Sequence, residues 1–322
     1  MPGSSSLNAV SAGGETLPAI DVLVPHYEAV DALALTLASI DAQAYGGRLR
    51  VVVADDGSSP ETLARLHGLL DARERPVVVL ENGVNRGRPY TRNVLLDATE
   101  SPFTAWLDAG DEWYPRKTAL QVEKALALGG AESAAPFWIT CNFDWKWSGN
   151  EASQRRQAVD QDQVMGLLRG KDLRAYLWTI LGPTRTFRDV GWFDEKLPRL
   201  QDLDFFLRFL IKGGMLHMPA TDESLCVYHK SDIGRDAEQV RACAGHIFDK
   251  HRVLYTRYGP KFTRVQLYNM EVHAARFAAN NGDSGRRRRY LWRAFRYRPK
   301  QFVRRWLDGG FRGGKGTVQH GG

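Results

Sequence analysis

Residues 49–61 read LRVVVADDGSSPE, and this stretch decides the fold class. The run 49–54 is almost continuously apolar and β-branched, which is typical of a strand covered on both faces. Two aspartates and a turn follow it, and Pro60 suits the first position of a helix. Ser58 and Glu61 have the spacing of a capping box. The stretch therefore predicts a buried strand, a polar turn and a helix.

The same pattern of strand and helix repeats on both sides of this stretch. We expect further strands at 20–24, 76–80 and 102–107, and helices at 30–40, 89–98 and 115–128. Four strands that are each followed by a helix make a βαβ series. The predicted fold class is therefore α/β, with a Rossmann-like, mostly parallel sheet flanked by helices.

Polar residues gather where the predicted strands end. Asp55 and Asp56 follow one strand, Asp108 and Asp111 follow another, and the loop 85–88 leads into a helix. Ligands of such sheets bind beyond the carboxyl ends of the strands. We therefore expect four carboxylates and a basic loop along one rim, as the candidate functional site.

The second half of the chain is less regular and ends in helices. Strands are expected at 136–143, 215–218 and 224–228, and helices at 161–169, 200–212, 237–258, 261–280 and 284–297. The predicted organisation is a disordered leader at 1–17, an α/β domain at 18–235, a helical appendage at 236–308 and a disordered, glycine-rich tail at 309–322.

The composition excludes several classes of protein. With 322 residues, 43% hydrophobic and 25% charged, the chain is not mainly disordered, collagen-like or a disulfide scaffold. No stretch approaches the roughly 18 consecutive apolar residues of a spanning helix, and the first residues do not resemble a signal peptide. Three widely spaced cysteines fit a reducing compartment without a zinc cluster. We expect a cytoplasmic protein, with peripheral contact at the inner face of the membrane as an open alternative.

The positive charge is concentrated in the C-terminal segment. The net charge is +7, yet residues 285–322 hold twelve Lys or Arg and one acid, so the rest of the chain is mildly acidic. Aromatic residues interleave with the arginines of 286–306. Three interpretations stay open: a solvated charged face, contact with an anionic membrane or a lipid-linked acceptor, or binding to nucleic acid. Nucleic acid is the least favoured, because the body is acidic and no reading motif is present.

Five short segments in order carry a resemblance to a known family. They are 20–25 with Tyr27, DDGS at 55–58, NRG at 85–87 with RN at 92–93, LDAGD at 107–111, and GWFDE at 191–195 with QDLD at 201–204. Over about residues 18–230 the chain resembles the family 2 glycosyltransferases of the GT-A fold. The resemblance implies inverting transfer of a sugar from a nucleotide diphosphate donor to an acceptor hydroxyl, in the hexosyl- or N-acetylhexosaminyl-transferase class. It also implies a nucleotide-sugar half at 18–130 and an acceptor half at 131–235.

The resemblance assigns the donor side of the site. One of the two carboxylates at 55–56 would accept the N–H of a uracil-type base, which favours a UDP-type donor, and two arginines would approach the diphosphate. The donor residues it implies are Pro25, Tyr27, Asp55, Asp56, Arg86, Arg92 and Asp108. A turn stabilised by aspartate and Gly57 is the alternative for the acidic pair, and a solvated basic loop is the alternative for the arginines.

The resemblance also implies a divalent metal, Mn²⁺ or Mg²⁺. Such an ion offsets the charge that builds on a leaving diphosphate, and it prefers carboxylate oxygens. The implied ligands are Asp108 and Asp111, with His229 completing the site. Gly110 occupies a position that is acidic in the commoner motif, so the role of Asp111 stays open. The alternative is that both acids only favour the start of the following helix.

On the acceptor side, inverting transfer needs a carboxylate base that takes the proton of the attacking hydroxyl. The resemblance places this base at Asp202, next to Gln201 where glutamate is more usual, and leaves Asp204 a structural role. Three tryptophans are candidates for contact with the acceptor or for the core: Trp145, Trp147 and Trp178.

Two other functions compete with a glycosyltransferase. A nucleotidyltransferase would open with a glycine-rich loop after the first strand, whereas this chain has PHYE at 25–28. A non-catalytic nucleotide-sugar-binding module stays open because Gly110 and Gln201 depart from the family pattern.

Overall fold

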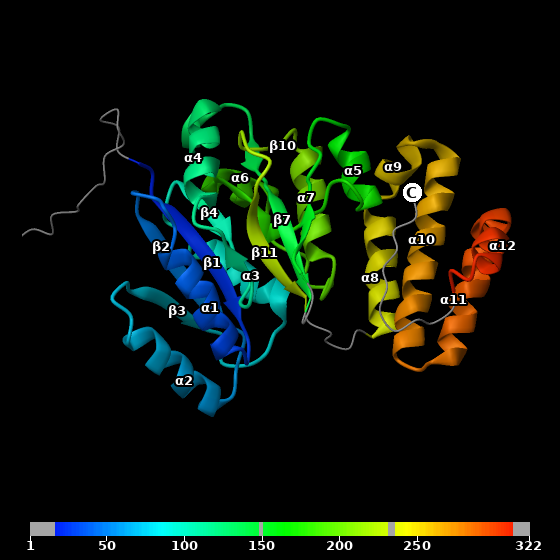
Figure 1. Ribbon diagram of the computed structural model, residues 1–322, viewed down its shortest axis with the longest axis horizontal. Coiled ribbons are helices and arrows are strands. Elements are labelled where there is room, and N and C mark those ends of the chain that lie inside the picture. The colour runs from blue at the N-terminus through cyan, green and yellow to red at the C-terminus, as the bar shows by residue number, and fades with distance from the viewer. Residues whose placement is uncertain (1–16, 148–150, 231–235, 312–322) are drawn as a thin grey trace, which may run out of the picture. The chain divides into compact units, whose positions relative to one another are not determined.

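The computed structural model describes residues 17–147, 151–230 and 236–311, and these form two compact units, up to Ser231 and from Asp232 (Figure 1). The predicted leader at 1–17 and tail at 309–322 lie almost entirely outside the described residues.

The first unit is built on a seven-stranded sheet in the order β10-β6-β9-β4-β1-β2-β3. Its strands are β1 (Ile20–His26), β2 (Leu49–Asp55), β3 (Val77–Glu81), β4 (Phe103–Trp106), β6 (Phe137–Ile139), β9 (Leu181–Pro183) and β10 (Met215–His217). β9 runs antiparallel to β4 and β6, and the other pairs are parallel. The prediction of a mostly parallel α/β sheet is confirmed.

Helices follow the first strands as the sequence predicts. They are α1 (Val30–Asp41), α2 (Pro60–Asp71), α3 (Arg88–Asp97) and α4 (Lys117–Ala127). Right-handed crossovers put α1 and α2 on one face of the sheet and α3 on the other (Figure 1). Every residue of β1 is buried, and burying one such Val or Leu side chain contributes about 1.5–3 kcal/mol. Both faces are therefore covered, as the β-branched runs require.

The N-terminus of α2 differs from the predicted capping box. The N-cap is Ser59, whose Oγ accepts the backbone N–H of Thr62 at 3.3 Å. Ser58 instead donates its hydroxyl to Asp55 at 2.6 Å. The capping-box prediction was wrong by one residue, because the preceding serine is drawn to the buried carboxylate.

Three further helices complete the first unit: α5 (Gln163–Arg169), α6 (Thr184–Val190) and α7 (Gln201–Ile211). Two 3₁₀ turns lie at Gly130–Glu132 and Leu177–Thr179. The indole of Trp138 in β6 stacks on Phe209 of α7 at 3.6 Å and on Phe187 of α6 at 4.6 Å between ring centroids. This aromatic packing fixes α7 against the sheet.

A second, four-stranded sheet has the order β5-β11-β7-β8. Its strands are β5 (Glu112–Trp113), β7 (Asn142–Trp147), β8 (Ser153–Arg155) and β11 (Ser224–Lys230). The single strand predicted at 136–143 was wrong, since this run contributes β6 to one sheet and β7 to the other. Thr140 and Asn142 at the change of sheet are polar but buried, and no glycine, proline or charged residue separates the two strands, so the sequence pattern does not mark the change.

The second unit is helical. Its elements are α8 (Ala237–Lys250), α9 (Arg252–Arg257), α10 (Gly259–Asn280), α11 (Ser284–Tyr297) and α12 (Pro299–Leu307). The long helix predicted at 237–258 is divided at His251. A buried ion pair between Arg241 and Glu271, at 2.7 Å, links α8 to α10. Among the described residues, no helix is both long enough and apolar enough to span a membrane.

Candidate active site

Arg92 lies at the centre of the candidate site. It is carried by α3, and its side chain is 1% exposed. Its Nη2 donates to both carboxylate oxygens of Asp108, at 2.9 and 3.1 Å, while its Nη1 donates to Oδ1 of Asp202. One guanidinium thus joins a carboxylate beyond the end of β4 to a carboxylate in the first turn of α7.

The environment of Asp108 favours its ionised form. Burial alone would raise the pKa of this carboxyl, but the charges of Arg92 and Arg88 outweigh burial and hold the pKa below its ordinary value. Arg88 is an exposed side chain whose Nη1 lies 3.9 Å from Oδ2 of Asp108. Asp108 is therefore an anion at neutral pH, at the carboxyl edge of the sheet.

The pKa of Asp202 is shifted in the opposite direction. Burial raises its pKa, Arg92 opposes the rise, and the nearby charge of Asp108 adds to it, so that the pKa lies above its ordinary value. The first turn of α7 partly offsets this, because a helix N-terminus favours negative charge. A carboxylate with a raised pKa accepts a proton more readily near neutral pH, as a general base must.

The backbone before Asp202 is strained. Leu200, the N-cap of α7, has a φ of 61°, in the left-handed region that residues with a branched side chain rarely adopt. Glu28, after β1, has a φ of 50°. Such strain often persists at functional sites because the surroundings over-determine the conformation. Leu200 is the residue at which the chain enters α7, two positions before Asp202.

Asp111 and His229 lie next to each other, but not as the sequence predicts. The backbone N–H of His229 donates to Oδ1 of Asp111 at 3.1 Å, while the imidazole Nε2 is bonded to Glu112 at 2.5 Å. Across the described part of the chain, no three His, Cys, Asp or Glu side chains converge on one metal position. The structure therefore does not gather Asp108, Asp111 and His229 into a single ligand set.

The two aspartates nevertheless fit a divalent cation. Asp111 is buried, and burial together with the charge of Asp108 raises its pKa well above the ordinary value. The charge of Arg88 and the backbone N–H of His229 oppose this rise without outweighing it. Mg²⁺-type ions in nucleotide sites commonly use one or two protein carboxylates together with substrate phosphates, so the donor set of Asp108 and Asp111 suits such an ion.

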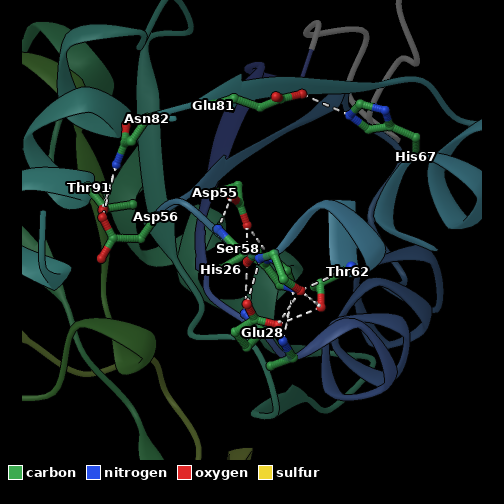
Figure 2. Close-up of polar contacts among 12 residues, drawn as sticks. His26, Glu28, Asp55, Asp56, Ser58, Thr62, His67, Glu81, Asn82 and Thr91 are labelled. Atoms are coloured by element: carbon green, nitrogen blue, oxygen red, sulfur yellow. Dashed lines mark hydrogen bonds and ion pairs between the residues drawn. The ribbon is translucent and has the colours of Figure 1, made fainter. Parts of the chain in front are cut away.

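Asp55 and Asp56 both stabilise loops (Figure 2). The buried Asp55 accepts hydrogen bonds from His26 Nδ1 at 2.8 Å and from the backbone N–H and hydroxyl of Ser58 at 2.8 and 2.6 Å. Asp56 accepts the backbone N–H groups of Arg86 and Gly87 at 3.0 and 2.9 Å. Asp56 thereby holds the loop before α3 at the rim, so the loop and the acidic pair meet there as the topology predicts.

Glu28 is a site-edge residue that sequence reasoning missed. Its carboxylate accepts the backbone N–H of Ser59 at 2.6 Å and the hydroxyl of Thr62 at 2.5 Å, so it ties the end of β1 to the start of α2 (Figure 2). These bonds lower the pKa of Glu28. Beside it, Pro25 is buried and Tyr27 is half-exposed. Tyr27 is therefore accessible to a ligand at this rim.

The two predicted phosphate-contacting arginines differ in accessibility. Arg86 is exposed, and its guanidinium lies 4.0 Å over the ring of Tyr90. Arg92 is buried and engaged by two carboxylates, and its approach to a diphosphate stays a prediction. Arg88, one helical turn before Arg92, is an exposed cation near Asp108. The sequence analysis placed it in the basic loop 85–88 but did not single it out as a site residue.

Two of the predicted acceptor residues, Trp145 and Trp178, lie in one aromatic cluster, where each contacts Phe143 and Tyr228. Trp178 is 3% exposed and its ring lies 5.0 Å from that of Tyr176 and 5.6 Å from that of Tyr228, so it packs as a core residue, which is one of the two roles that the sequence left open. Trp145 is half-buried, with Arg155 and Arg174 over its ring. The side chain of Trp147 lies outside the described residues.

Gln201 is buried at the start of α7. Within the described part of the chain, its Oε1 has no hydrogen-bond partner. Asp204, two residues beyond Asp202, is fully buried and accepts the Nε of Arg208 at 2.9 Å. Arg208 in turn binds the carbonyl oxygens of Val190 and Trp192, so Asp204 stabilises the loop before α7.

Comparison with known proteins identifies the class to which this arrangement belongs. Residues 21–176 match the family described as Glycosyl transferase family 2. The chain is 44% identical over 162 residues to an N-acetylglucosaminyltransferase of Rhizobium leguminosarum bv. phaseoli, an alignment that covers 44% of this chain and 38% of that protein. Residues 21–176, just under half of the chain, therefore correspond to a family 2 glycosyltransferase domain. Its alignments span less than half the length of the curated relatives it matches.

Solved structures show the same fold. Staphylococcus aureus TarS 1-349 in complex with UDP-GlcNAc has a TM-score of 0.56 at 16% identity, over 90% of this chain and 92% of that one. The mannosyltransferase PcManGT of Pyrobaculum calidifontis, in complex with GDP-Man and Mn²⁺, has a TM-score of 0.56 at 15% identity, over 95% of this chain and 83% of that one. The predicted GT-A fold is confirmed.

Proposed function

We propose that this chain transfers a sugar with inversion from a UDP-type nucleotide diphosphate donor to an acceptor hydroxyl, with Asp202 as the general base. The observation that carries the proposal is the shared guanidinium of Arg92, which joins the donor-side carboxylate of Asp108 to the base. N-acetylglucosamine is the favoured sugar, because a relative is named for its transfer and a structure of similar fold binds UDP-GlcNAc.

The donor would lie at the carboxyl edge of the sheet. Tyr27 is accessible for contact with the base and ribose, and the exposed cations Arg86 and Arg88 suit the negative charge of the diphosphate. Asp108 and Asp111 would hold a Mn²⁺ or Mg²⁺ ion, which supplies Lewis-acid stabilisation of the leaving diphosphate when bound.

Transfer is a single displacement. The acceptor oxygen attacks the anomeric carbon, the bond from that carbon to the diphosphate oxygen breaks, and the hydroxyl proton passes to Asp202. Arg92 engages Oδ1 of Asp202, and within the described residues Oδ2 accepts no hydrogen bond, which leaves it for the proton. Arg92 also fixes the orientation of the carboxylate, which is the positioning that such a reaction requires.

The test is donor turnover by the full chain. UDP release from UDP-GlcNAc, UDP-glucose and GDP-mannose is measured with Mn²⁺ and with EDTA, alongside calorimetric binding of each donor. The proposal expects a UDP-sugar to bind with Mn²⁺ and to be turned over. Binding without turnover, even with a panel of acceptor sugars, would instead support the non-catalytic binding module.

A further inference from the structure

The second unit buries one side of α11 and exposes the other. Tyr290 and Ala294 are buried, whereas Trp292 is 60% exposed and Phe295 is 41% exposed. At about 3.6 residues per turn, the exposed aromatics project from the side opposite Tyr290. Three exposed arginines share this outward side: Arg288, Arg289 and Arg296.

The next helix, α12, has an apolar face without a partner. This nine-residue helix contains no buried residue. Val303, Trp306 and Leu307 are 45%, 64% and 70% exposed, and their spacing places them on one face. Isolated helices shorter than about 12 residues are marginal in water, so a helix of this length normally gains its stability by burying such a face.

The contacts of α12 involve its other side. Phe302 is half-buried, and its ring lies 5.6 Å from that of Phe295 and 4.8 Å from that of Phe311. These contacts join α12 to α11. Within the described residues, they leave the face formed by Val303, Trp306 and Leu307 uncovered.

Charge indicates what covers this face. Basic residues flank it on α12, and the segment 285–322 carries twelve Lys or Arg against the single acid Asp308. A partner must therefore be anionic and must also accept large apolar side chains. A nucleic acid would satisfy the charge but leave Trp306 and Leu307 in water. The boundary between headgroups and acyl chains of an anionic bilayer takes both kinds of side chain.

We propose that α11 and α12 bind the surface of an anionic lipid bilayer. Trp292, Val303, Trp306 and Leu307 enter the boundary between headgroups and acyl chains, and the surrounding arginines contact lipid phosphates. Tryptophan suits this position because its ring is apolar and its N–H can be hydrated. The proposal concerns the second unit and does not depend on the proposed transferase activity.

The test is co-sedimentation of the full chain with vesicles of phosphatidylcholine, alone or mixed with phosphatidylglycerol. The proposal expects binding to the mixed vesicles and weak binding to the neutral ones, with the difference reduced by salt. The double variant Trp306→Ser/Leu307→Ser should weaken binding by about tenfold or more, since it removes apolar burial. Arg288→Gln and Arg289→Gln should each weaken binding to mixed vesicles by about fivefold.

Two matched controls lie on other helices of the same unit. Val253→Ser alters a side chain on α9 that is 79% exposed, and Arg264→Gln removes an exposed arginine of α10. Both should bind vesicles like the wild type. All the altered side chains are exposed, so the variants should stay folded, which circular dichroism and thermal unfolding verify.

Three outcomes would overturn the proposal. The first is equal binding to neutral and anionic vesicles, which removes the role of charge. The second is wild-type binding by Trp306→Ser/Leu307→Ser, which removes the role of the apolar face. The third is absence of vesicle binding by the wild type, accompanied by one of two findings. Either the wild type is a dimer that Trp306→Ser/Leu307→Ser dissociates, or the wild type binds duplex DNA. Each finding assigns the exposed face to a partner other than a bilayer. None of these outcomes affects donor binding, so the two proposals fail separately.

Discussion

Arg92 and Asp202 lie 110 positions apart in the sequence, yet the guanidinium of one donates a hydrogen bond to the carboxylate of the other. The same guanidinium also binds Asp108. The repulsion between the two carboxylates is therefore compensated by one buried cation, and any change at Arg92 acts on both sides of the candidate site.

The first prediction concerns Arg92. Arg92→Leu should lower the free energy of unfolding by roughly 3 kcal/mol, which is the lower end of the range for a broken buried ion pair. We expect the lower end because the carboxylates left without a partner, Asp108 and Asp202, are 23% and 20% exposed and can be partly hydrated. Arg92→Lys keeps the cation but loses the forked geometry, and should be less destabilised. Urea unfolding of the three proteins measures both effects.

The same variants should change the pH dependence of turnover. The charge of Arg92 lowers the pKa of Asp202 against the effect of burial. Without that charge the pKa of the base rises, so the acidic limb of the rate profile should move to higher pH in Arg92→Leu and less in Arg92→Lys. An unmoved limb in a folded Arg92→Leu protein would mean that Arg92 does not act on the base.

The second prediction uses Asp55. Burial would raise its pKa, but bonds from Ser58 and His26 outweigh burial and lower it. A lowered folded-state pKa contributes stability that is present above the unfolded value, near 3.9, and lost as the pH falls through the folded value. Asp55→Asn should therefore be destabilised at neutral pH by about 1–3 kcal/mol, with the difference from wild type shrinking in acid.

Urea unfolding at neutral pH and at successively lower pH checks this prediction. Asp97→Asn is the matched control, because Asp97 is an exposed carboxylate at the end of α3. A difference between Asp55→Asn and wild type that persists unchanged to low pH would show that its cause is packing rather than ionisation.

The third prediction concerns the metal. Asp108→Ala should weaken UDP binding in Mn²⁺ and have little effect in EDTA, because the lost contact runs through the ion. Calorimetric titration of UDP under both conditions measures this, with Asp97→Ala as the control. Equal losses of affinity in Mn²⁺ and EDTA would contradict a metal role for Asp108.

The first half of the fold could be predicted from the sequence because each of its strands is indicated by two separate sequence signals. Each is an apolar run, and each ends in a turn or helix-start signal such as DDGSSP at 55–60. The later strands lack such marks. β9 has three residues and runs antiparallel to its neighbours. The run 136–143 changes sheets at Thr140 and Cys141, without a glycine, proline or charged residue, so tertiary packing alone defines these strands.

For the site, the sequence located residues better than it assigned their contacts. The shared edge of Asp56, Arg86 and Asp108 follows from parallel topology alone. The burial of Arg92 does not, because it depends on α7 arriving from a distant part of the chain with Asp202. The role of Trp178 stayed open for a similar reason: an aromatic side chain suits a core and a sugar site equally, and its stacking on Tyr176 and Tyr228 becomes visible only in the folded structure.

The last prediction separates the base from its neighbour. Asp202→Asn keeps the size of the side chain but removes its ability to take a proton. Loss of a general base typically costs ~10²–10⁴ in rate, or about 3–5 kcal/mol in the barrier. Donor affinity should barely change, because the base faces the acceptor rather than the diphosphate.

Asp204→Asn is the matched control, since it makes the same chemical change two residues away. Asp204 is fully buried and bonded to Arg208, so this variant should lose stability and keep most of its turnover below its melting temperature. Single-turnover transfer, donor dissociation constants and urea unfolding of both variants give the comparison. Near-wild-type transfer by Asp202→Asn, or a larger catalytic loss in Asp204→Asn, would assign the base to another residue, because proton transfer cannot survive removal of the group that accepts the proton.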